Sequence, residues 1–353
     1  MTRVLVSGRV IDKQVGGNTR YARKIYDDIS SFGITHQIAR PAKESARFRS
    51  LKYALTETVT MPLSGRWDFD VLHFPADTGA VSKGRRPIVG TIHGLATLHV
   101  PNVRKGIHDK LWRTRVGRLA DVSTRIITVS NSSARDIATL FPGTSSKIVP
   151  ILHGIDHEKF NIHAGRELDT EAVAELGVDG PYFLYLGNLD PRKNIVELVR
   201  AATLVYEETG VPLLIAGGRA WDSDSILACI EESLGVTYLG RVDERYLVPL
   251  MRQALAFCFP SKYEGFGFPV VEAMACGTPV ICSNRGSLAE VAGDAAMVLD
   301  NIDYQSIKGA MLEMAANSSL RDDLRTRGLV NSLRFDWAKS VEQHAQVFHE
   351  VAN

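Results

Sequence analysis

The chain has 353 residues, of which 45% are hydrophobic and 23% charged, and its formal net charge is +1. This composition excludes disordered, collagenous and coiled-coil proteins, and no run approaches the roughly 18 uninterrupted apolar residues of a membrane-spanning helix. The net charge conceals an imbalance, because residues 1–163 hold 25 lysines and arginines against 13 aspartates and glutamates, whereas residues 164–353 hold 16 against 27. A basic half followed by an acidic half predicts two domains with different tasks. The basic half would meet nucleic acid, an anionic membrane face or a phosphorylated acceptor, and the two halves would also attract each other.

Short β-rich runs alternate with helix-compatible stretches along the chain. In the first half the predicted strands are Val4–Ser7, Val71–Phe74, Ile88–Ile92 and Ile126–Val129. In the second half they are Tyr182–Leu186, Leu213–Ala216, Val236–Leu239, Ala256–Phe259 and Pro279–Cys282. This alternation is typical of parallel sheets covered by helices. It predicts an α/β protein with two doubly wound, Rossmann-like domains that face a central cleft, with ligands at the carboxyl ends of the strands.

The domain limits follow from a polar, weakly periodic linker at 153–166. We expect a first domain over 1–163, a second over 164–335, and a C-terminal amphipathic helix over 336–353 that packs back on the first. Other helix limits are readable as well. Asn18-Thr19 predicts a helix start, Pro269 and Gly277 the start and end of another helix, and Ser287 with Glu290 a capping box.

The cellular location is predicted from the cysteines and from the start of the chain. Cys229, Cys258, Cys276 and Cys282 have no C-x-x-C spacing and lie in apolar runs, as reduced thiols do. The first residues enter a strand-like run and lack the apolar core of a secretory signal. We therefore expect a cytoplasmic protein.

A basic stretch at 104–119 carries much of the first half's charge. Ile107, Leu111 and Trp112 lie among Lys110, Arg113, Arg115 and Arg118, which predicts a basic amphipathic helix. One interpretation is a peripheral contact with anionic lipid on the inner face of the cell membrane. The other is a solvated basic face whose apolar residues enter the core.

Several common site motifs are missing or weak. G-x-G-x-x-G and G-x-x-x-x-G-K-[ST] are both absent, which argues against a dinucleotide enzyme or a P-loop NTPase. Asp68 and Asp70 match the D-x-D spacing of one type of metal site, but they precede a predicted strand and we interpret them as structural. We expect neither a metal nor a cofactor.

The most informative stretch runs from Ser261 to Pro279, after the apolar run 254–259. Gly265 and Gly267 let the backbone approach a ligand, and the helix start that follows offers free N–H donors. Glu264 lies in the loop and Glu272 on the helix, and such carboxylates accept hydrogen bonds from vicinal hydroxyls of a sugar. The alternative is that both side chains are solvent-exposed.

The run E-G-F-G-F-P-x-x-E-A-M-A-C-G-T-P-V at 264–280, with residues 283–295, resembles glycosyltransferase family 4. That family has the GT-B fold and two glutamates separated by seven residues. The resemblance covers most of 181–300, through Leu186–Asn194, Ile215–Trp221 and Tyr238–Val242. It is looser in the first half, where it rests on Gly16-Gly17, Thr91-Ile92-His93 and Val129-Ser130. The motifs are similar to those of bacterial mannosyltransferases that build O-antigen and capsule polysaccharides.

The resemblance implies a role for each matching residue. Glu264 would contact the donor sugar together with the backbone amides of Phe266, Gly267 and Phe268. Glu272 would hold the ribose hydroxyls, and residues from Gly240 to Val242 would touch the nucleobase. Lys193 and the backbone amides of Ser287 and Leu288 would hold the diphosphate. In the first domain, Gly16-Gly17 would form the glycine-rich loop beside the diphosphate and acceptor, and His93 would lie at the cleft floor.

The chain departs from the family pattern at three positions. Many relatives have arginine where Asn188 stands, so Arg192 is the substitute cation that we consider. Relatives often read His-Asp where this chain reads His93-Gly94, which leaves that histidine without the usual carboxylate. Relatives also tend to have asparagine where His153 stands.

The reaction implied by the resemblance is retaining, metal-independent transfer of a hexose to a saccharide or lipid-linked acceptor in cell-surface polysaccharide synthesis. Mannose from GDP-mannose is favoured, and a UDP-sugar or dTDP-sugar is the alternative donor. Catalysis would stabilise the leaving diphosphate with Lys193, the 287–288 amides and Arg192. Front-face attack is expected, against double displacement through a carboxylate. Two other classes remain: a phosphorylase or epimerase of the same fold, and a nucleic-acid or anionic-surface binding protein that uses the basic half.

Overall fold

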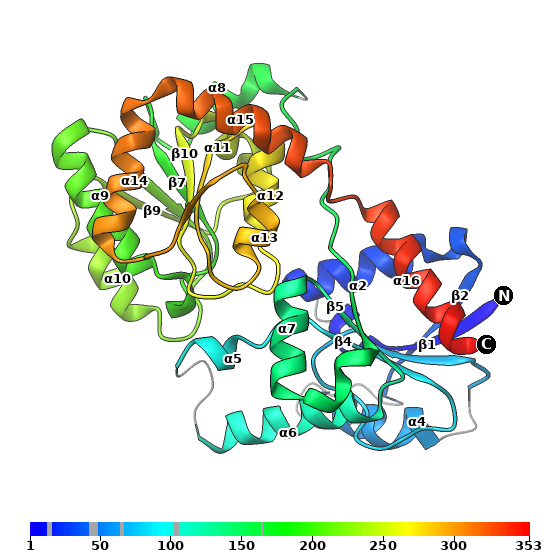
Figure 1. Ribbon diagram of the computed structural model, residues 1–353. Helices are drawn as coiled ribbons and strands as arrows, with labels where there is room; N and C mark the ends of the chain where they lie inside the picture. The colour runs from blue at the N-terminus through cyan, green and yellow to red at the C-terminus, as the bar shows by residue number, and fades with distance from the viewer. Residues whose placement is uncertain (13–15, 42–48, 64–66, 102–105, 164) are drawn as a thin grey trace. The chain divides into compact units, whose positions relative to one another are not determined.

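The computed structural model describes residues 1–12, 16–41, 49–63, 67–101, 106–163 and 165–353. The chain divides into two compact units, which we call unit 1 (Met1–Gly154 and Asp336–Asn353) and unit 2 (Ile155–Phe335). The chain thus leaves unit 1 inside the polar stretch 153–166 and returns to it after Phe335. Each unit is a six-stranded parallel sheet with helices packed on it (Figure 1).

The unit 1 sheet has the strand order β2-β1-β3-β4-β5-β6. Its strands are β1 (Thr2–Ser7), β2 (Ile34–Ala39), β3 (Val71–Phe74), β4 (Ile88–Ile92), β5 (Arg125–Thr128) and β6 (Ile148–Pro150). Its helices are α1 (Gly8–Ile11), α2 (Gly17–Asp28), α3 (Arg49–Leu55), α4 (Met61–Leu63), α5 (Ala96–His99), α6 (Ile107–Val122), α7 (Asn131–Leu140) and α16 (Trp337–Ala352). A π-helical turn, Thr56–Thr60, joins α3 to α4.

The unit 2 sheet has the order β12-β11-β10-β7-β8-β9. Its strands are β7 (Phe183–Leu186), β8 (Leu213–Ala216), β9 (Val236–Gly240), β10 (Ala256–Phe259), β11 (Val280–Ser283) and β12 (Met297–Leu299). Its helices are α8 (Asp169–Ala174), α9 (Ile195–Thr209), α10 (Asp224–Glu231), α11 (Glu244–Gln253), α12 (Phe268–Ala275), α13 (Leu288–Ala292), α14 (Tyr304–Ala316) and α15 (Ser318–Ser332). The four central strands are buried throughout, because helices cover both faces of a parallel sheet.

The predicted α/β class with two doubly wound sheets is confirmed, and each predicted strand overlaps an observed one. Three strands were not predicted: β2, β6 and β12. Each of them forms an edge of its sheet and has a partner strand on one side only. β2 carries exposed and half-exposed polar residues, and β6 and β12 are three residues long. Edge strands need no continuous apolar run, so the sequence signal is weak there.

The predicted helix starts were partly wrong. Helix α2 is capped by Gly16 at φ 98°, not by Asn18 or Thr19, and the Thr19 hydroxyl donates to the carbonyl of Val10. Ser287 precedes α13 but makes no side-chain cap, so the predicted capping box does not form. Pro269 does lie in the first turn of α12, and Gly277 follows it at φ 74°, the left-handed conformation that commonly ends a helix.

Helix α16 belongs to unit 1, where it contacts α2, β1 and β3. Its buried residues include Val341, His344 and Phe348. The side chain of His344 reaches Tyr21 on α2, with 2.8 Å between Nε2 and the phenol oxygen. The last helix therefore helps to complete the core of the unit in which the chain begins.

Helix α6 covers the described part of the predicted basic stretch, and Arg104 and Lys105 lie outside the described residues. Trp112 packs against the core cluster of β4 and β5, but Ile107 and Leu111 are exposed, so the prediction that all three apolar residues enter the core was wrong. Two of the basic side chains are engaged inside unit 1. Arg113 pairs with Asp109, and Arg115 Nη2 lies 3.8 Å from a carboxylate oxygen of Glu57.

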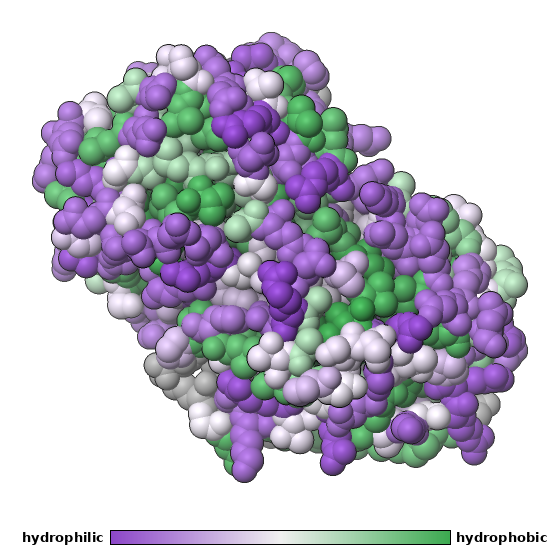
Figure 2. Space-filling view, in the orientation of Figure 1, coloured by the Kyte–Doolittle hydropathy of each residue, from purple (hydrophilic) through white to green (hydrophobic). Residues whose placement is uncertain are grey.

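No helix within the described residues is long and apolar enough to cross a membrane. On the face seen in the space-filling view, hydrophilic residues predominate and hydrophobic ones are scattered among them (Figure 2).

Candidate functional site

The site in unit 2 lies where the strand order reverses. β7 and β10 are neighbours in the sheet, yet the chain continues from β7 outward to β8 and β9, and from β10 outward to β11 and β12. The loops after β7 and β10 therefore diverge and leave a crevice at the carboxyl ends of the strands, the usual ligand position in such sheets. The loop after β7 carries Asp190, Arg192 and Lys193, and the loop after β10 carries Glu264.

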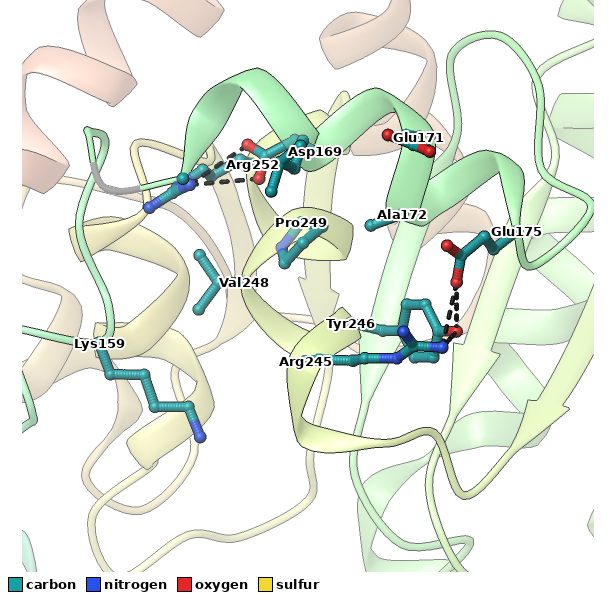
Figure 3. Close-up of a pocket in the computed structure, with 12 residues that line it drawn as sticks. Lys159, Asp169, Glu171, Ala172, Glu175, Arg245, Tyr246, Val248, Pro249 and Arg252 are labelled. Carbon is teal, nitrogen blue, oxygen red and sulfur yellow. Dashed lines mark hydrogen bonds and ion pairs between the residues drawn. The ribbon is translucent and has the colours of Figure 1, made fainter.

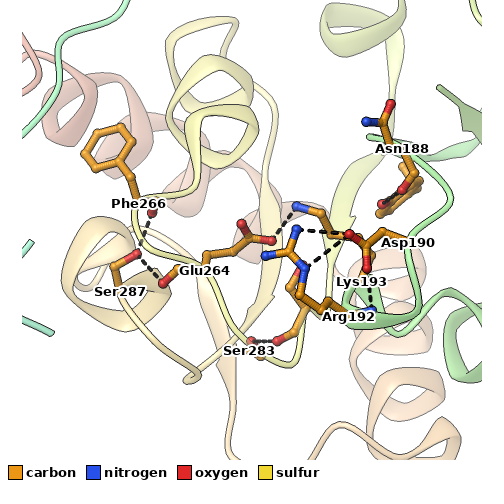
Figure 4. Close-up of polar contacts among 10 residues, drawn as sticks. Asn188, Asp190, Arg192, Lys193, Glu264, Phe266, Ser283 and Ser287 are labelled. Carbon is orange, nitrogen blue, oxygen red and sulfur yellow. Dashed lines mark hydrogen bonds and ion pairs between the residues drawn. The ribbon is translucent and has the colours of Figure 1, made fainter. Parts of the chain in front are cut away.

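Lys193 and Glu264 meet at this reversal, although 71 positions separate them (Figure 4). The lysine Nζ donates to Glu264 Oε1 at 2.5 Å, and the two side chains are 13% and 12% exposed. Nζ also lies 4.7 Å from the centre of the Phe259 ring, at the end of β10. A short 3-10 turn, Pro191–Lys193, places the lysine, and the Asp190 carboxylate caps that turn by accepting from the Arg192 amide.

Arg192 lies on the other side of the same turn. Its Nε and Nη2 donate to Asp190 Oδ2 at 3.1 and 3.0 Å. Burial disfavours the charged guanidinium, but Glu264 and Asp190 outweigh that effect and raise the pKa of Arg192 above its ordinary value. Two basic side chains and two carboxylates are therefore concentrated in one crevice, and Asn188 lies on the same loop (Figure 4).

The loop after β11 fixes the backbone of Glu264. The Ser287 amide donates to the Glu264 carbonyl at 2.9 Å, and the Ser287 hydroxyl donates to the carbonyl oxygens of Glu264 and Phe266 at 3.1 and 2.7 Å. Gly286 has φ 61°, and a Cβ there would lie 2.3 Å from the Glu264 carbonyl oxygen. The sequence predicted that the Ser287 amide would face a diphosphate. Because this amide is bonded inside the protein, we revise that interpretation. Ser287 instead holds the loop that carries Glu264.

The other unit 2 residues predicted for the donor lie around the same sheet edge. Gly267 caps α12 at φ 104°, Phe266 packs edge-on against Phe268 with ring centres 5.0 Å apart, and Leu288 begins α13. Glu272 lies on α12 and is 7% exposed, so the alternative of an exposed helix residue is wrong for it.

The predicted nucleobase segment starts where β9 ends. The Gly240 carbonyl accepts from the Gly217 amide at 2.7 Å, and Val242 is partly buried just beyond it. Gly217 in turn lies so close to the loop after β7 that a Cβ would be 1.9 Å from the Gly187 carbonyl oxygen. Backbone contacts thus connect the loops that follow β7, β8 and β9.

The predicted residues of unit 1 form a separate group within that unit. His93 follows β4, and its ring lies edge-on to Tyr21 of α2, with ring centres 4.9 Å apart. Gly16 and Gly17 are exposed at the start of the same helix. Gly94 offers His93 no carboxylate. Asp77 Oδ1 instead accepts a hydrogen bond from the His93 backbone amide at 2.8 Å. Burial lowers the pKa of His93, against the opposing effect of Asp77, so its imidazole is neutral at pH 7.

Sequence reasoning missed the residues that support these groups. Asp190 is inside the quoted motif 186–194, and its place before Pro191 was the available signal for a cap. Asp77 and the buried histidines His73, His153 and His344 come from separate segments, and no spacing in the sequence relates them to His93. Within the described residues, no cluster of three or more histidine, cysteine, aspartate or glutamate side chains could hold a metal ion.

A pocket of about 420 Å³ lies elsewhere in unit 2, between α8 and α11 (Figure 3). Arg252 and Asp169 form a buried ion pair at its wall, with 3.2 Å between Nη1 and Oδ1. Both helices lead into the amino ends of strands β7 and β10, so this pocket is not at the carboxyl edge that carries Lys193 and Glu264.

Two family models match the chain: "Glycosyl transferases group 1" over residues 169–329 and "Glycosyltransferase Family 4" over residues 27–159. The chain is 33% identical over 260 residues to O-antigen chain mannosyltransferase B of Escherichia coli, covering 72% of this chain and 68% of that protein. It is 27% identical over 222 residues to the serotype-specific mannosyltransferase WbdA of Escherichia coli, of which it spans 27%.

Solved structures share the fold across the whole chain. Sucrose-phosphate synthase of Thermosynechococcus elongatus matches with a TM-score of 0.79 and 18% identity, covering 99% of both chains. HepE of Anabaena, in complex with UDP-glucose, matches with a TM-score of 0.73 and 15% identity, covering 99% of this chain and all of that one. The predicted resemblance is confirmed: the chain belongs to the family 4 glycosyltransferases and has their GT-B fold.

Proposed function

We propose that this glycosyltransferase moves mannose from GDP-mannose to a saccharide or lipid-linked acceptor in the synthesis of a cell-surface polysaccharide. The support for mannose and for the polysaccharide comes from the relatives, since two of them are O-antigen or serotype-specific mannosyltransferases. A UDP-sugar is the competing donor, because the structurally similar HepE binds UDP-glucose. Transfer proceeds with retention at the anomeric carbon and without a metal ion.

The observation that carries the proposal is the Lys193–Glu264 pair at the strand reversal of unit 2. Without a ligand, the carboxylate neutralises the lysine. A donor diphosphate would take over that role, because two phosphates offer the ammonium group more negative charge than one carboxylate. Glu264 would then accept hydrogen bonds from the hydroxyls of the sugar attached to that diphosphate. The proposal thus assigns the diphosphate of the donor to Lys193 and its sugar to Glu264.

The chemical step requires negative charge to leave the anomeric carbon on the diphosphate. Lys193 stabilises that charge, and Arg192 adds a second cation from the same 3-10 turn. Both predicted backbone donors are bonded within the protein, the Ser287 amide to the Glu264 carbonyl and the Leu288 amide, at 3.3 Å, to the Arg285 carbonyl, so the two cations carry this stabilisation. The acceptor hydroxyl attacks from the face that the diphosphate leaves, and the leaving phosphate takes its proton. Glu272 binds the ribose, the 240–242 segment contacts the base, and His93 with Gly16-Gly17 serves the acceptor side.

A thermal-shift screen tests the donor. GDP-mannose should raise the unfolding temperature of the protein more than UDP-glucose, ADP-glucose or a dTDP-sugar at equal concentration, because a ligand stabilises the state that binds it. A larger shift with a UDP-sugar would change the proposed donor but not the proposed binding site. No shift with any nucleotide sugar would refute the proposal.

The stereochemistry needs its own measurement. Proton NMR of the product should show the α-linkage of GDP-mannose retained, and EDTA should leave the rate unchanged. A trapped covalent glycosyl-enzyme would favour double displacement over front-face attack.

A further inference from the structure

A helical segment of unit 1 faces solvent with its apolar side. From Leu51 to Leu63 it runs through α3, the π-helical turn and α4. Leu51, Leu55, Val59 and Leu63 are 59%, 55%, 50% and 52% exposed, and we call these four residues the leucine stripe. They recur every four residues, which places them on one side of a helix. Thr60 is the only other exposed residue of 51–63.

The opposite side of the segment is buried and partly polar. Tyr53, Glu57 and Met61 are buried, with Glu57 only 1% exposed. The hydroxyl of Ser7 donates to Glu57 Oε1 at 2.7 Å, and Arg9 donates to Oε2 at 3.1 Å. Turning the helix to bury its leucines would break these contacts and leave two charges without partners, which is strongly unfavourable. The buried glutamate therefore fixes the rotation that exposes the stripe.

Basic side chains lie at the end of the stripe. The Arg85 amide donates to the Pro62 carbonyl at 3.3 Å, so the loop 81–86 lies against α4, beside Leu63. Lys83, Arg85 and Arg86 in that loop are all exposed, and the loop contains no acidic residue. The segment 49–63 contains one acidic residue, the buried Glu57. Within these two segments no exposed acidic residue lies between the leucine stripe and the basic side chains, although Arg86 also interacts with Asp70 outside them.

Helix α6 adds two residues of the same kind. Ile107 and Leu111 are exposed and lie eight and four positions before Arg115, whose guanidinium points at Glu57. Residues at this spacing share one side of a helix, so Ile107 and Leu111 lie on the side of α6 that carries Arg115.

We propose that the leucine stripe, with Lys83, Arg85 and Arg86, is a docking surface for an anionic lipid bilayer. Leucines that enter the headgroup region and basic residues that meet lipid phosphates are the two contributions that hold a protein at such an interface. A second copy of this chain fits the surface less well, because pairing two stripes would bring two sets of these basic side chains together. The surface does not depend on the proposed donor or acceptor, and it assigns the lipid contact to residues other than Arg113 and Arg115.

Vesicle sedimentation of the full chain tests this surface. The protein should bind vesicles of phosphatidylglycerol mixed with phosphatidylcholine, and binding should weaken with salt and on vesicles of phosphatidylcholine alone. The double variant Leu55→Glu, Leu63→Glu should lose at least about tenfold in vesicle affinity, because it removes two apolar contacts and adds two negative charges. The triple variant Lys83→Gln, Arg85→Gln, Arg86→Gln should lose most of its preference for anionic vesicles.

The matched control is Leu234→Glu, Leu333→Glu. These leucines of unit 2 are 59% and 70% exposed, so the control adds the same charge at comparably exposed sites and should bind vesicles like the wild type. Equal unfolding temperatures of the proteins would establish that the variants fold. Absence of wild-type binding to anionic vesicles would overturn the proposal. So would unchanged vesicle binding of the Leu55, Leu63 variant, or equal losses in that variant and the control. If ultracentrifugation showed a wild-type dimer that this variant dissociates while its vesicle binding is unchanged, the stripe would be a protein interface.

Discussion

Lys193 and Glu264 are each mostly buried and directly paired, so neither can be removed without leaving the other charge in a poorly solvated crevice. Arg192 and Asp190 form a second pair from the same turn. In the proposed reaction this arrangement would keep cations in place before a diphosphate arrives, which is the condition for electrostatic stabilisation without reorganisation of the site.

The first prediction concerns the lysine. Lys193→Gln should reduce the rate of sugar transfer by about 10²–10³, because it removes a charge that acts on the leaving diphosphate. Steady-state transfer assays measure the effect. Lys262→Gln is the control, since Lys262 is an exposed lysine in the Glu264 loop and its loss should leave the rate nearly unchanged. Equal rates for the wild type and Lys193→Gln would contradict the role given to Lys193.

The second prediction separates the two glutamates. Glu272→Ala should weaken the affinity for GDP itself, because its proposed partner is the ribose. Glu264→Ala should preserve GDP affinity and strongly reduce transfer, since its proposed partner is the sugar and its removal leaves Lys193 free for the diphosphate. Calorimetry with GDP and a transfer assay measure both quantities. Equal loss of GDP affinity in the two variants would show that their roles are not separate.

Residues of the proposed site could be named from the sequence where a local motif contains them. Glu264, Glu272 and Lys193 lie in motifs that can be read directly. The contact between Lys193 and Glu264 could not be predicted from spacing, because it depends on β7 and β10 being neighbours in the sheet. The internal partner of the Ser287 amide could not be predicted either, because the Glu264 carbonyl lies 23 positions away in another loop.

At the scale of elements, the loop after β11 determines the position of the loop after β10. Gly286 is the contact point, because only glycine leaves room for the Glu264 carbonyl at this φ. The two loops follow neighbouring strands, so a shift of one alters the other.

The third prediction follows from that contact. Gly286→Ala should destabilise the protein by roughly 1–3 kcal/mol, because φ is positive and the added Cβ meets backbone atoms. It should also lower transfer by displacing Glu264. Gly309→Ala is the control: Gly309 is exposed in α14 with open space around it, so alanine should stabilise by about 0.5–1 kcal/mol. Urea unfolding measures both changes. Destabilisation of the two variants by the same amount would contradict this account of Gly286.

Elements were predictable where burial imposes a continuous apolar run. The central strands of both sheets have such runs, and all were found. Strands β2, β6 and β12 were missed because sheet edges allow polar or half-exposed residues. The exposed leucines of 51–63 also have no sequence signature, since an apolar helical stripe ordinarily predicts a buried face.

At the scale of the whole chain, unit 1 is basic and contains a buried group of histidines, whereas unit 2 is acidic and carries the Lys193–Glu264 pair. Tyr21, Thr91 and His73 are joined by hydrogen bonds at the centre of unit 1, and His344 reaches them from α16. Burial lowers the pKa of His344 to about 4 and those of His73 and His153 well below their ordinary value.

The fourth prediction is an acid-dependent loss of stability in unit 1. Unfolded histidines bind protons below about pH 6.5, whereas His344 stays neutral in the folded state down to about pH 4. Stability is therefore complete above pH 6.5 and falls as the pH drops toward 4, by on the order of 3 kcal/mol from His344 alone. Arg3 lowers the pKa of Asp70 to about 2, so that carboxylate remains charged across the window.

Tryptophan fluorescence during urea unfolding measures this effect, because Trp67, Trp112 and Trp337 are in unit 1 and only Trp221 is in unit 2. His344→Gln should be less stable than the wild type at pH 7.5 and should lose less stability between pH 7.5 and 4.5. A wild-type unfolding free energy that does not change over this range would contradict the burial of neutral histidines.

The central claim is that a nucleotide sugar binds at the strand reversal of unit 2, through its diphosphate. A crystal structure of the protein soaked with GDP-mannose tests it most directly. The account predicts diphosphate oxygens within hydrogen-bond distance of Lys193 Nζ, with Glu264 released from the lysine and bonded to the sugar. A diphosphate bound away from Lys193, with the Lys193–Glu264 pair intact, would contradict it.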